Sequence, residues 1–223
     1  MPFIQDAETA GSAPLTYVPA SLYGGAITCL LPSNFADVSD LRQVPDHQEV
    51  YLDKDGYTSI VVDILERVEK ENDQEALKYH LKDLVQEDEG EVTTWNISEV
   101  KMGKLHEIDW CGKGEEMLMY NAVRRDTIPA YTLLATTPPG ARQRGRAHEP
   151  DFVGVLLLLI RLVEQKTDVL VAVNVPHIPG HYVAGEVDLE RRMTGGLLRV
   201  GGEIREKIVE SLEIKDWELF VQE

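Results

Sequence analysis

Two strongly apolar segments lie only three residues apart, and this arrangement constrains the chain more than any other feature. The segments are FVGVLLLLIRLV at 152–163 and TDVLVAVNVP at 167–176. Such a short connection permits an antiparallel hairpin but not a parallel crossover, which needs roughly a dozen residues or more. In the second segment valines alternate with other residues, and both resulting faces are mostly apolar. The hairpin is therefore predicted to lie centrally in a sheet that is covered on both sides.

Strand and turn patterns elsewhere predict further strands. LYGGAITCLLP at 22–32 is typical of a strand whose two glycines permit a bend. QEVYLDKDGYTSIVVDILERV at 48–68 predicts two strands joined by a turn over 53–56. Weaker patterns indicate strands between 92 and 126, and DWELFV at 216–221 is expected to be a final strand.

Two longer helices are predicted. Asn72 and Glu75 have the spacing of a capping box at the start of a helix that continues to residue 85. Ile204, Ile208 and Leu212 recur at helical spacing and predict a helix near the C-terminus. The glycine pairs just before these residues are expected to flank that helix.

A short helical turn is expected at Ser39–Arg42, before Pro45. Together the elements predict an α+β fold, with a central, mainly antiparallel sheet of about six strands and helices on both faces.

The length of 223 residues fits one large domain with one well-buried core. Residues 1–20 are small and polar and contain proline, so we expect a flexible tail followed by a single domain over 21–223. The proline-rich stretch at 136–151 is expected to be an exposed loop. Its three arginines fit a localisation or nucleic-acid patch, but arginines in a proline-rich loop more often belong to an ordinary solvated loop, and this is the interpretation we favour.

The chain is strongly acidic. It has 39 acidic and 22 basic residues and a formal net charge of −17, most of it in the first 120 residues. Nucleic acid and anionic membranes are thus not expected as partners, because both require a positive face. A basic partner fits the charge, as does simple solubility. No secretory leader is recognisable and the apolar run at 153–160 is too short to cross a bilayer, so we expect a soluble intracellular protein.

Sequence motifs for nucleotide, metal or acyl-transfer chemistry are missing from the chain: it has no GxxxxGK[ST] loop, no HExxH helix and no GxSxG elbow. His177 and His181 have the spacing of two metal ligands on a helix, but the prolines and glycine around them predict a surface loop. Cys29 and Cys111 match no metal or redox spacing and are expected to be reduced thiols. No cofactor and no metal are expected.

RQVPDHQEVY at 42–51 is the stretch most specific for function. Around Pro45 it groups charged and ring-bearing side chains, namely Arg42, Asp46, His47 and Glu49. Such a group fits a catalytic site, a metal site or a docking surface. It also fits an ordinary turn in which Pro45 and Asp46 reverse the chain and Glu49 is an exposed strand residue.

Several stretches in the same order carry a family resemblance. They are LYGGAIT, FxDVSxxRQVPDHQEVY, SIVVDILE, ALKYHLKDL, IRLxxxxTDVLVAVNVP and SLEIKDWELF, which together sample residues 22–220. In these residues the chain resembles the Ran guanine nucleotide release factor family, the Mog-type proteins of nuclear import. The loop PPGARQRGR and residues 178–195 have no counterpart in that family and look like insertions.

The resemblance implies a fold and a function. The fold is a central antiparallel sheet with helices on both faces, shared with the PsbP proteins. The function is to bind the small GTPase Ran and promote release of its guanine nucleotide in nuclear protein import, as a regulator and not as an enzyme. The resemblance further implies a monomer found in nucleus and cytoplasm, and it leaves a further Ran-binding protein open as a second partner.

The resemblance also implies a binding site. In that family the acidic positions of the VPDxQEVY segment are implicated in Ran binding, and here they correspond to Asp46 and Glu49. Gln48 lies between them, and Asp37 and Arg42 are neighbours, so these five residues are the predicted partner-binding site. Two alternatives remain on the same fold: an acidic adaptor without exchange activity, and a small-molecule binding domain.

Overall fold

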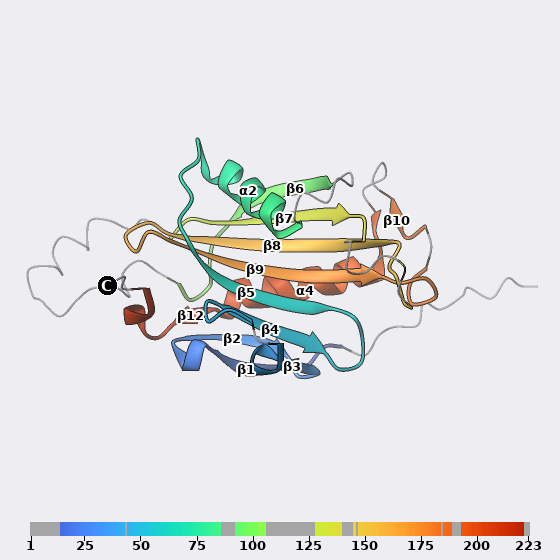
Figure 1. Ribbon diagram of the computed structural model, residues 1–223, viewed down its shortest axis with the longest axis horizontal. Coiled ribbons are helices and arrows are strands. Elements are labelled where there is room, and N and C mark those ends of the chain that lie inside the picture. Colours follow the sequence, from blue (N-terminus) through green and yellow to red (C-terminus); the bar gives the residue numbers. More distant parts are fainter. Residues whose placement is uncertain are drawn as a thin grey trace, which may run out of the picture.

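A computed structural model of the chain describes residues 14–42, 44–85, 92–105, 128–139, 145, 147–183, 185–188 and 193–220. Its main sheet has seven strands in the order β3-β4-β5-β9-β8-β7-β6, and every neighbouring pair is antiparallel (Figure 1). The strands are β3 (Phe35–Asp37), β4 (Gln48–Asp53), β5 (Ser59–Glu66), β6 (Thr93–Val100), β7 (Ala130–Thr137), β8 (Phe152–Leu162) and β9 (Thr167–His177).

The remaining elements are short strands and helices that cover this sheet. A second sheet, ordered β1-β2-β12, consists of β1 (Tyr17–Leu22), β2 (Ile27–Pro32) and β12 (Glu213–Ile214). A two-stranded ribbon pairs β10 (Val187–Asp188) with β11 (Met193–Thr194). The helices are α1 (Ser39–Arg42), α2 (Asp73–Val85) and α4 (Gly195–Ser211), with 3-10 turns η1 (Tyr23–Gly25) and η3 (Trp217–Phe220).

The predicted central hairpin is confirmed as β8 and β9. The two strands pair along their whole length, from Phe152 with His177 to Leu162 with Thr167. Successive side chains of a strand point to opposite faces, so alternate residues enter two separate hydrophobic clusters. Leu158 and Val171 belong to the larger cluster, whereas the adjacent Leu157 belongs to the smaller one.

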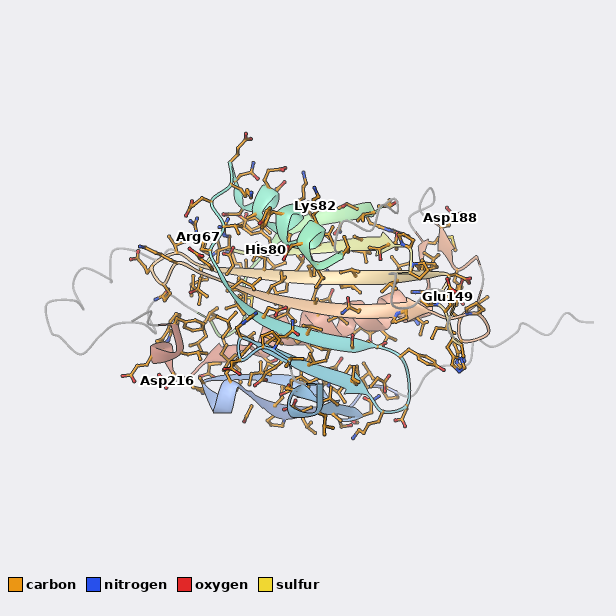
Figure 2. The ribbon with its side chains drawn as sticks, in the orientation of Figure 1. Arg67, His80, Lys82, Glu149, Asp188 and Asp216 are labelled. Carbon is orange, nitrogen blue, oxygen red and sulfur yellow. The ribbon has the colours of Figure 1, made fainter. Side chains whose placement is uncertain are left out.

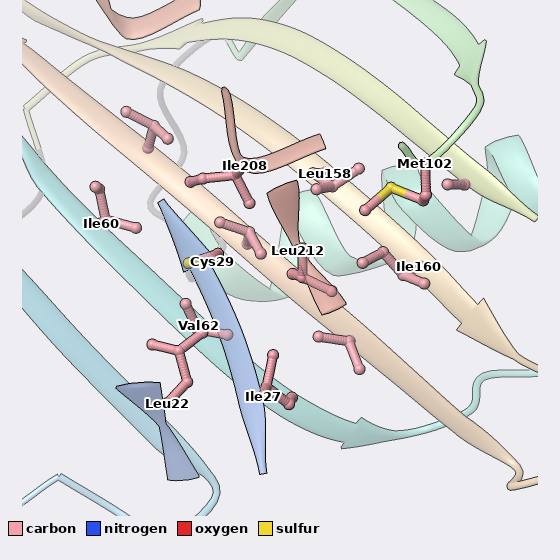
Figure 3. Packing of buried hydrophobic residues seen from close by; sticks show 14 of the residues in the cluster. Leu22, Ile27, Cys29, Ile60, Val62, Met102, Leu158, Ile160, Ile208 and Leu212 are labelled. Atoms are coloured by element: carbon pink, nitrogen blue, oxygen red, sulfur yellow. The ribbon is translucent and has the colours of Figure 1, made fainter. Parts of the chain in front are cut away.

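The two faces of the main sheet have different covers. On one face α4 and the β1-β2-β12 sheet pack together, with Ile208 and Ile27 in the same cluster as Leu158 (Figure 3). On the other face α2 supplies Leu77 and Leu81 to the smaller cluster. The prediction of an α+β fold with a central antiparallel sheet and helices on both faces is thus confirmed, with seven strands in place of about six.

The local predictions for residues 39–85 are also confirmed. The β4–β5 hairpin forms, with Leu52 paired to Ser59 and a connection that runs from residue 54 to residue 58 where a turn over 53–56 was predicted, and α1 occupies the predicted turn. The Asn72 side chain accepts a hydrogen bond of 2.9 Å from the Glu75 backbone N–H. This is the N-cap half of the predicted capping box, since the Glu75 carboxylate itself pairs with Lys78.

The N-terminal tail is shorter than predicted. Tyr17–Leu22 forms β1, which pairs with β2, and Leu22 is fully buried. The polar and proline residues of this short edge strand conceal it in the sequence, because its outer face lies in water. The predicted strand at 22–32 is correspondingly divided by the turn η1. Residues 1–13 lie outside the described residues.

The C-terminal predictions need two corrections. The segment Trp217–Phe220 is a 3-10 turn and not a strand: Asp216 accepts a 2.9 Å hydrogen bond from the Glu218 N–H and thereby initiates the turn. The glycine pairs lie inside α4 and not beside it. Gly201 is buried where α4 crosses the sheet, and a Cβ built there would lie 2.8 Å from Val175 Cγ2. The glycine therefore permits a close approach of helix and sheet.

Three further predictions fall partly outside the described residues. Of the strands expected between 92 and 126, β6 is present and the part beyond residue 105 is not described. The expected loop at 136–151 begins later, since Thr136 and Thr137 are buried in β7, and its arginines are not described. Cys29 is a buried free thiol, and Cys111 is not described.

His177 was expected in a surface loop and is instead buried at the end of β9. Its ring stacks on Phe152, with 4.1 Å between centroids, and its Nδ1 lies 2.9 Å from the Val175 carbonyl oxygen. Burial lowers the pKa of this imidazole. In the part of the chain that the structure describes, no three His, Cys, Asp or Glu residues are grouped so as to hold a metal ion, and no helix is long and apolar enough to span a bilayer.

A buried charge network joins α2 to the closed end of the central hairpin. Arg161, 1% exposed, donates hydrogen bonds to Asp168 Oδ1 (3.0 Å) and Asp73 Oδ1 (2.7 Å). His80 of α2 lies 2.8 Å from the other oxygen of Asp168, which is itself fully buried (Figure 2). A third Arg161 hydrogen bond, to the Val68 carbonyl, satisfies the guanidinium further. Every charge in this network is thus paired inside the fold.

Removal of one member should be strongly destabilising. Asp168→Ala leaves the Arg161 guanidinium buried without one partner, and we expect it to lower the free energy of unfolding by about 3–5 kcal/mol. The matched control is Lys78→Ala, which breaks the exposed Glu75–Lys78 pair and should change that free energy by less than about 1 kcal/mol. Chemical denaturation measures both. Similar small losses would show that the network contributes little.

The adjacent glycines of α4 should respond with opposite signs to the same substitution. Gly201→Ala inserts a methyl group against Val175 and Leu156 and should destabilise the protein by about 1–3 kcal/mol. Gly202→Ala meets no atom within 4 Å and should stabilise it by up to about 1 kcal/mol, because alanine favours helix. Thermal unfolding distinguishes them, and a shift of both variants in one direction contradicts the close-approach explanation.

Candidate partner-binding site

Residues 37–42 and 44–49 lie beside β4 near the edge of the main sheet and are named here the α1–β4 surface. Short backbone links attach it to β4: the Val38 N–H donates to the Val50 carbonyl (2.9 Å), and the Val50 N–H donates to Ser39 Oγ (3.0 Å). The turn of α1 closes with a 3.1 Å hydrogen bond from the Leu41 N–H to the Val38 carbonyl. The surface is therefore held on a strand and is not a free loop.

Asp46 lies in an exposed turn just before β4. Pro45, Asp46 and His47 are all exposed. The Gln48 N–H donates to the Pro45 carbonyl (2.8 Å), which closes a turn and starts β4. Among the described residues the Asp46 carboxylate has no hydrogen-bond or ion-pair partner. Its charge is thus available to a partner molecule.

Asp37 combines a local structural role with exposure. Its Oδ1 accepts hydrogen bonds from the Ser39 backbone N–H (2.9 Å) and the Ser39 hydroxyl (2.6 Å). This arrangement caps the start of α1. The side chain is nevertheless exposed, so Asp37 adds negative charge just before α1 as Asp46 does just after it.

Glu49 is half-buried and faces the β1–β2 connection. Its Oε1 accepts a 2.6 Å hydrogen bond from the Tyr23 backbone N–H, and its Oε2 lies 3.3 Å from the Tyr51 hydroxyl, which donates to it. Burial raises the pKa of the Tyr51 hydroxyl, and the nearby Glu49 carboxylate raises that pKa further. Glu49 is therefore held in one orientation by internal donors, unlike Asp46.

The donor to Glu49 depends on the LYGG stretch. Tyr23, Gly24 and Gly25 have φ angles of 50°, 66° and 95°, a left-handed turn that glycine adopts readily. The Tyr23 hydroxyl donates to the Val62 carbonyl (2.8 Å) and so fixes the turn against β5. A segment distant in sequence thus determines the position of a predicted site residue.

Gln48 is directed into the sheet and not toward solvent alone. Its Nε2 donates a 2.7 Å hydrogen bond to Oδ1 of Asp63, a buried residue of β5. Burial raises the pKa of the Asp63 carboxyl, and the Gln48 hydrogen bond opposes that rise. Gln48 therefore compensates a buried acid, and its role at the surface is indirect.

The five predicted residues all lie in the α1–β4 surface, but the described side chains differ in exposure and in the groups that they contact. Asp37 and Asp46 face outward, whereas Gln48 and Glu49 are half-buried. Arg42 ends α1, and its side chain lies outside the described residues. The sequence analysis missed Tyr23 as the partner of Glu49, although the glycine pair after it indicates an unusual backbone at that point.

The two acidic residues should differ in their effect on stability. Glu49→Ala leaves the half-buried Tyr23 N–H without its acceptor and should lower the free energy of unfolding by about 1–3 kcal/mol. Asp46→Ala removes an exposed carboxylate and should change it by less than about 0.5 kcal/mol. Urea denaturation of the two variants tests this. Equal, small effects would mean that Tyr23 does not position Glu49.

Comparison with known proteins gives a family match over most of the chain. The family described as "Ran-interacting Mog1 protein" matches residues 20–176, which include the whole α1–β4 surface. The Ran guanine nucleotide release factor of Bos taurus is 46% identical over 155 residues, covering 70% of this chain and 74% of that protein.

A yeast relative matches in both sequence and structure. The nuclear import protein MOG1 of Saccharomyces cerevisiae is 33% identical over 167 residues, a region that spans 70% of this chain and 64% of that protein. The crystal structure of the Saccharomyces cerevisiae Ran-binding protein Mog1p aligns with a TM-score of 0.64 at 24% identity, covering 93% of this chain and all of that one, which establishes a common fold. On this evidence the chain belongs to the Ran-interacting Mog1 family.

Proposed function

We propose that this protein binds the GTPase Ran and promotes release of its bound guanine nucleotide, in support of nuclear protein import. Family membership and the names of the relatives, release factor and nuclear import protein, support this function. The observation that carries the proposal is the exposed carboxylate of Asp46, which has no partner among the described residues, on a hydrogen-bonded edge of the sheet inside the matched region. Such a protein regulates a GTPase and makes or breaks no covalent bond itself.

Nucleotide release follows from thermodynamic linkage. A GTPase holds its nucleotide largely through the phosphates, a lysine and Mg²⁺. A protein that binds the empty GTPase more tightly than the loaded one must weaken nucleotide binding by the same factor. The carboxylate of Asp46 can pair with a basic group that the departing phosphate leaves without a partner. This contact exists only in the empty state and therefore favours release.

The residues of the α1–β4 surface have different roles in this proposal. Asp46 makes the direct charge contact, and Asp37 adds negative potential beside it. Glu49, held by Tyr23, presents its charge in a fixed orientation, so little conformational freedom is lost on binding. The net charge of −17 steers a basic partner toward this surface and raises the association rate.

The same proposal includes a monomeric protein that acts in nucleus and cytoplasm. Mutual repulsion between copies with a net charge of −17 supports the monomer. The relatives named for nuclear import support work on both sides of the nuclear envelope. A further Ran-binding protein is included in the proposal as a second partner.

A release assay with purified Ran tests the function. Ran loaded with a fluorescent guanine nucleotide is mixed with the protein and excess unlabelled nucleotide, and the wild type should accelerate the loss of fluorescence. Asp46→Asn should reduce that acceleration by about tenfold or more, since loss of one member of a close charge pair costs about 2 kcal/mol. Asp55→Asn removes an equal exposed charge from the β4–β5 turn and should have a much smaller effect.

The outcomes separate the alternatives. Binding of Ran without faster release would select the adaptor function on the same fold. If Asp46→Asn and Asp55→Asn reduce the release rate equally, Asp46 acts only through the overall charge of the protein. A third variant, Glu49→Gln, keeps an oxygen for the Tyr23 N–H while removing the charge, so it tests the charge of Glu49 without the loss of stability expected for alanine.

A further inference from the structure

Leu41, in the middle of α1, is exposed to an unusual degree. Its side chain is 83% exposed, the highest value for a large hydrophobic residue in the part of the chain that the structure describes. Burial of a leucine side chain is favourable, and at this position the fold does not gain that stabilisation. Single apolar residues on a surface are ordinary, so the exposure alone carries no conclusion.

The rigidity of its position sets Leu41 apart. The Leu41 N–H donates a hydrogen bond to the Val38 carbonyl. Val38 and Ser39 are both hydrogen-bonded to Val50 of β4. Asp37 caps the same turn through two hydrogen bonds. The backbone that carries Leu41 is therefore preorganised, and a partner that buries the side chain does not have to order a loop first.

The charged surroundings also set it apart. Asp37 precedes α1 and Asp46 follows it, and both carboxylates are exposed. An apolar anchor that becomes fully buried, with a rim of polar and charged groups, is the usual organisation of a protein interface. Asp37 and Asp46 flank Leu41 within ten residues of chain, and all three are exposed, as such an organisation requires.

We propose that Leu41 is the apolar anchor of the partner-binding surface and inserts into a hydrophobic depression bordered by basic side chains on the GTPase. This inference rests on the function proposed above and adds a residue to it. The occupant is a basic protein and not another copy of this chain, because Asp37 and Asp46 would repel the same acidic surface on a second copy.

The anchor and its rim contribute through different forces. Burial of Leu41 is a hydrophobic contribution that depends little on ionic strength and acts mainly on the dissociation rate. The carboxylate of Asp46 acts through charge and affects the association rate, and salt screens its effect within about 10 Å at 0.1 M. Salt dependence therefore distinguishes the two contributions in one assay.

The test measures affinity for nucleotide-free Ran and stimulated nucleotide release, at about 50 mM and 300 mM salt. Leu41→Ala should weaken binding about tenfold at both salt concentrations, through faster dissociation. The loss caused by Asp46→Asn should shrink at the higher salt concentration. Leu41→Met, which keeps an apolar side chain of similar volume, should restore affinity to within about threefold of the wild type.

Two controls protect the interpretation. Val163→Ala shortens another exposed apolar residue, 51% exposed beside the β8–β9 turn, and should leave binding unchanged. The melting temperature of Leu41→Ala should equal that of the wild type, because the side chain is largely in water. If the melting temperature of Leu41→Ala drops, Leu41→Ser and Leu41→Met are compared in its place. Leu41→Met must then bind Ran more tightly than Leu41→Ser.

Each result bears on the inference. If the wild type accelerates release and Leu41→Ala binds within twofold of it, the anchor is wrong and the proposed function stands. If the wild type binds Ran without accelerating nucleotide release, the proposed function is wrong. The affinity of Leu41→Ala for Ran then decides by itself whether Leu41 is the anchor. If the wild type does not bind Ran, both are wrong. Dimerisation of the protein that Leu41→Ala abolishes would assign the leucine to self-association and overturn the proposal.

Discussion

The structure depends on one hairpin that is buried on both faces. Because β8 and β9 alternate their side chains between two hydrophobic clusters, neither strand can lie at an edge or face water. The chain must therefore supply strands on either side of the hairpin and a cover for each face. The α1–β4 surface is one result: β5 pairs with β9, and β4 pairs with β5. The candidate site is thus positioned by a core that lies two strands away from it.

Much of this fold could be predicted from the sequence where the signal is local. The hairpin, the β4–β5 turn, α1 and the Asn72 cap all depend on residues within a few positions of one another. The sequence-based predictions were wrong where tertiary contacts determine the local structure. The sequence around Gly201 is typical of a helix flank, and only the packing of α4 on β9 explains the glycine, since a Cβ there would lie 2.8 Å from a β9 side chain. The strand Tyr17–Leu22 has no recognisable strand pattern and is defined by its pairing with β2.

The candidate site shows the same division. The residue types at 42–51 left a catalytic site, a metal site, a docking surface and an ordinary turn open, and only the family resemblance implied a docking surface for Ran, the partner that the family match also names. Neither could separate Asp46, which faces water, from Glu49, which accepts a hydrogen bond from Tyr23. That difference depends on a turn 26 residues away in sequence. The exposure of Leu41 likewise cannot be predicted from the sequence, because its neighbours in the chain do not determine whether a distant segment covers its side chain.

The unequal covers of the sheet also determine how the molecule opens. The face under α4 shares its hydrophobic cluster with the second sheet, so that cover separates only when much of the fold does. The opposite face has α2 as its helical cover, attached by Ala76, Leu77 and Leu81 and by the bonds of Arg161 and His80. We therefore expect the amide hydrogens of α2 to exchange with solvent before those of β8 and β9.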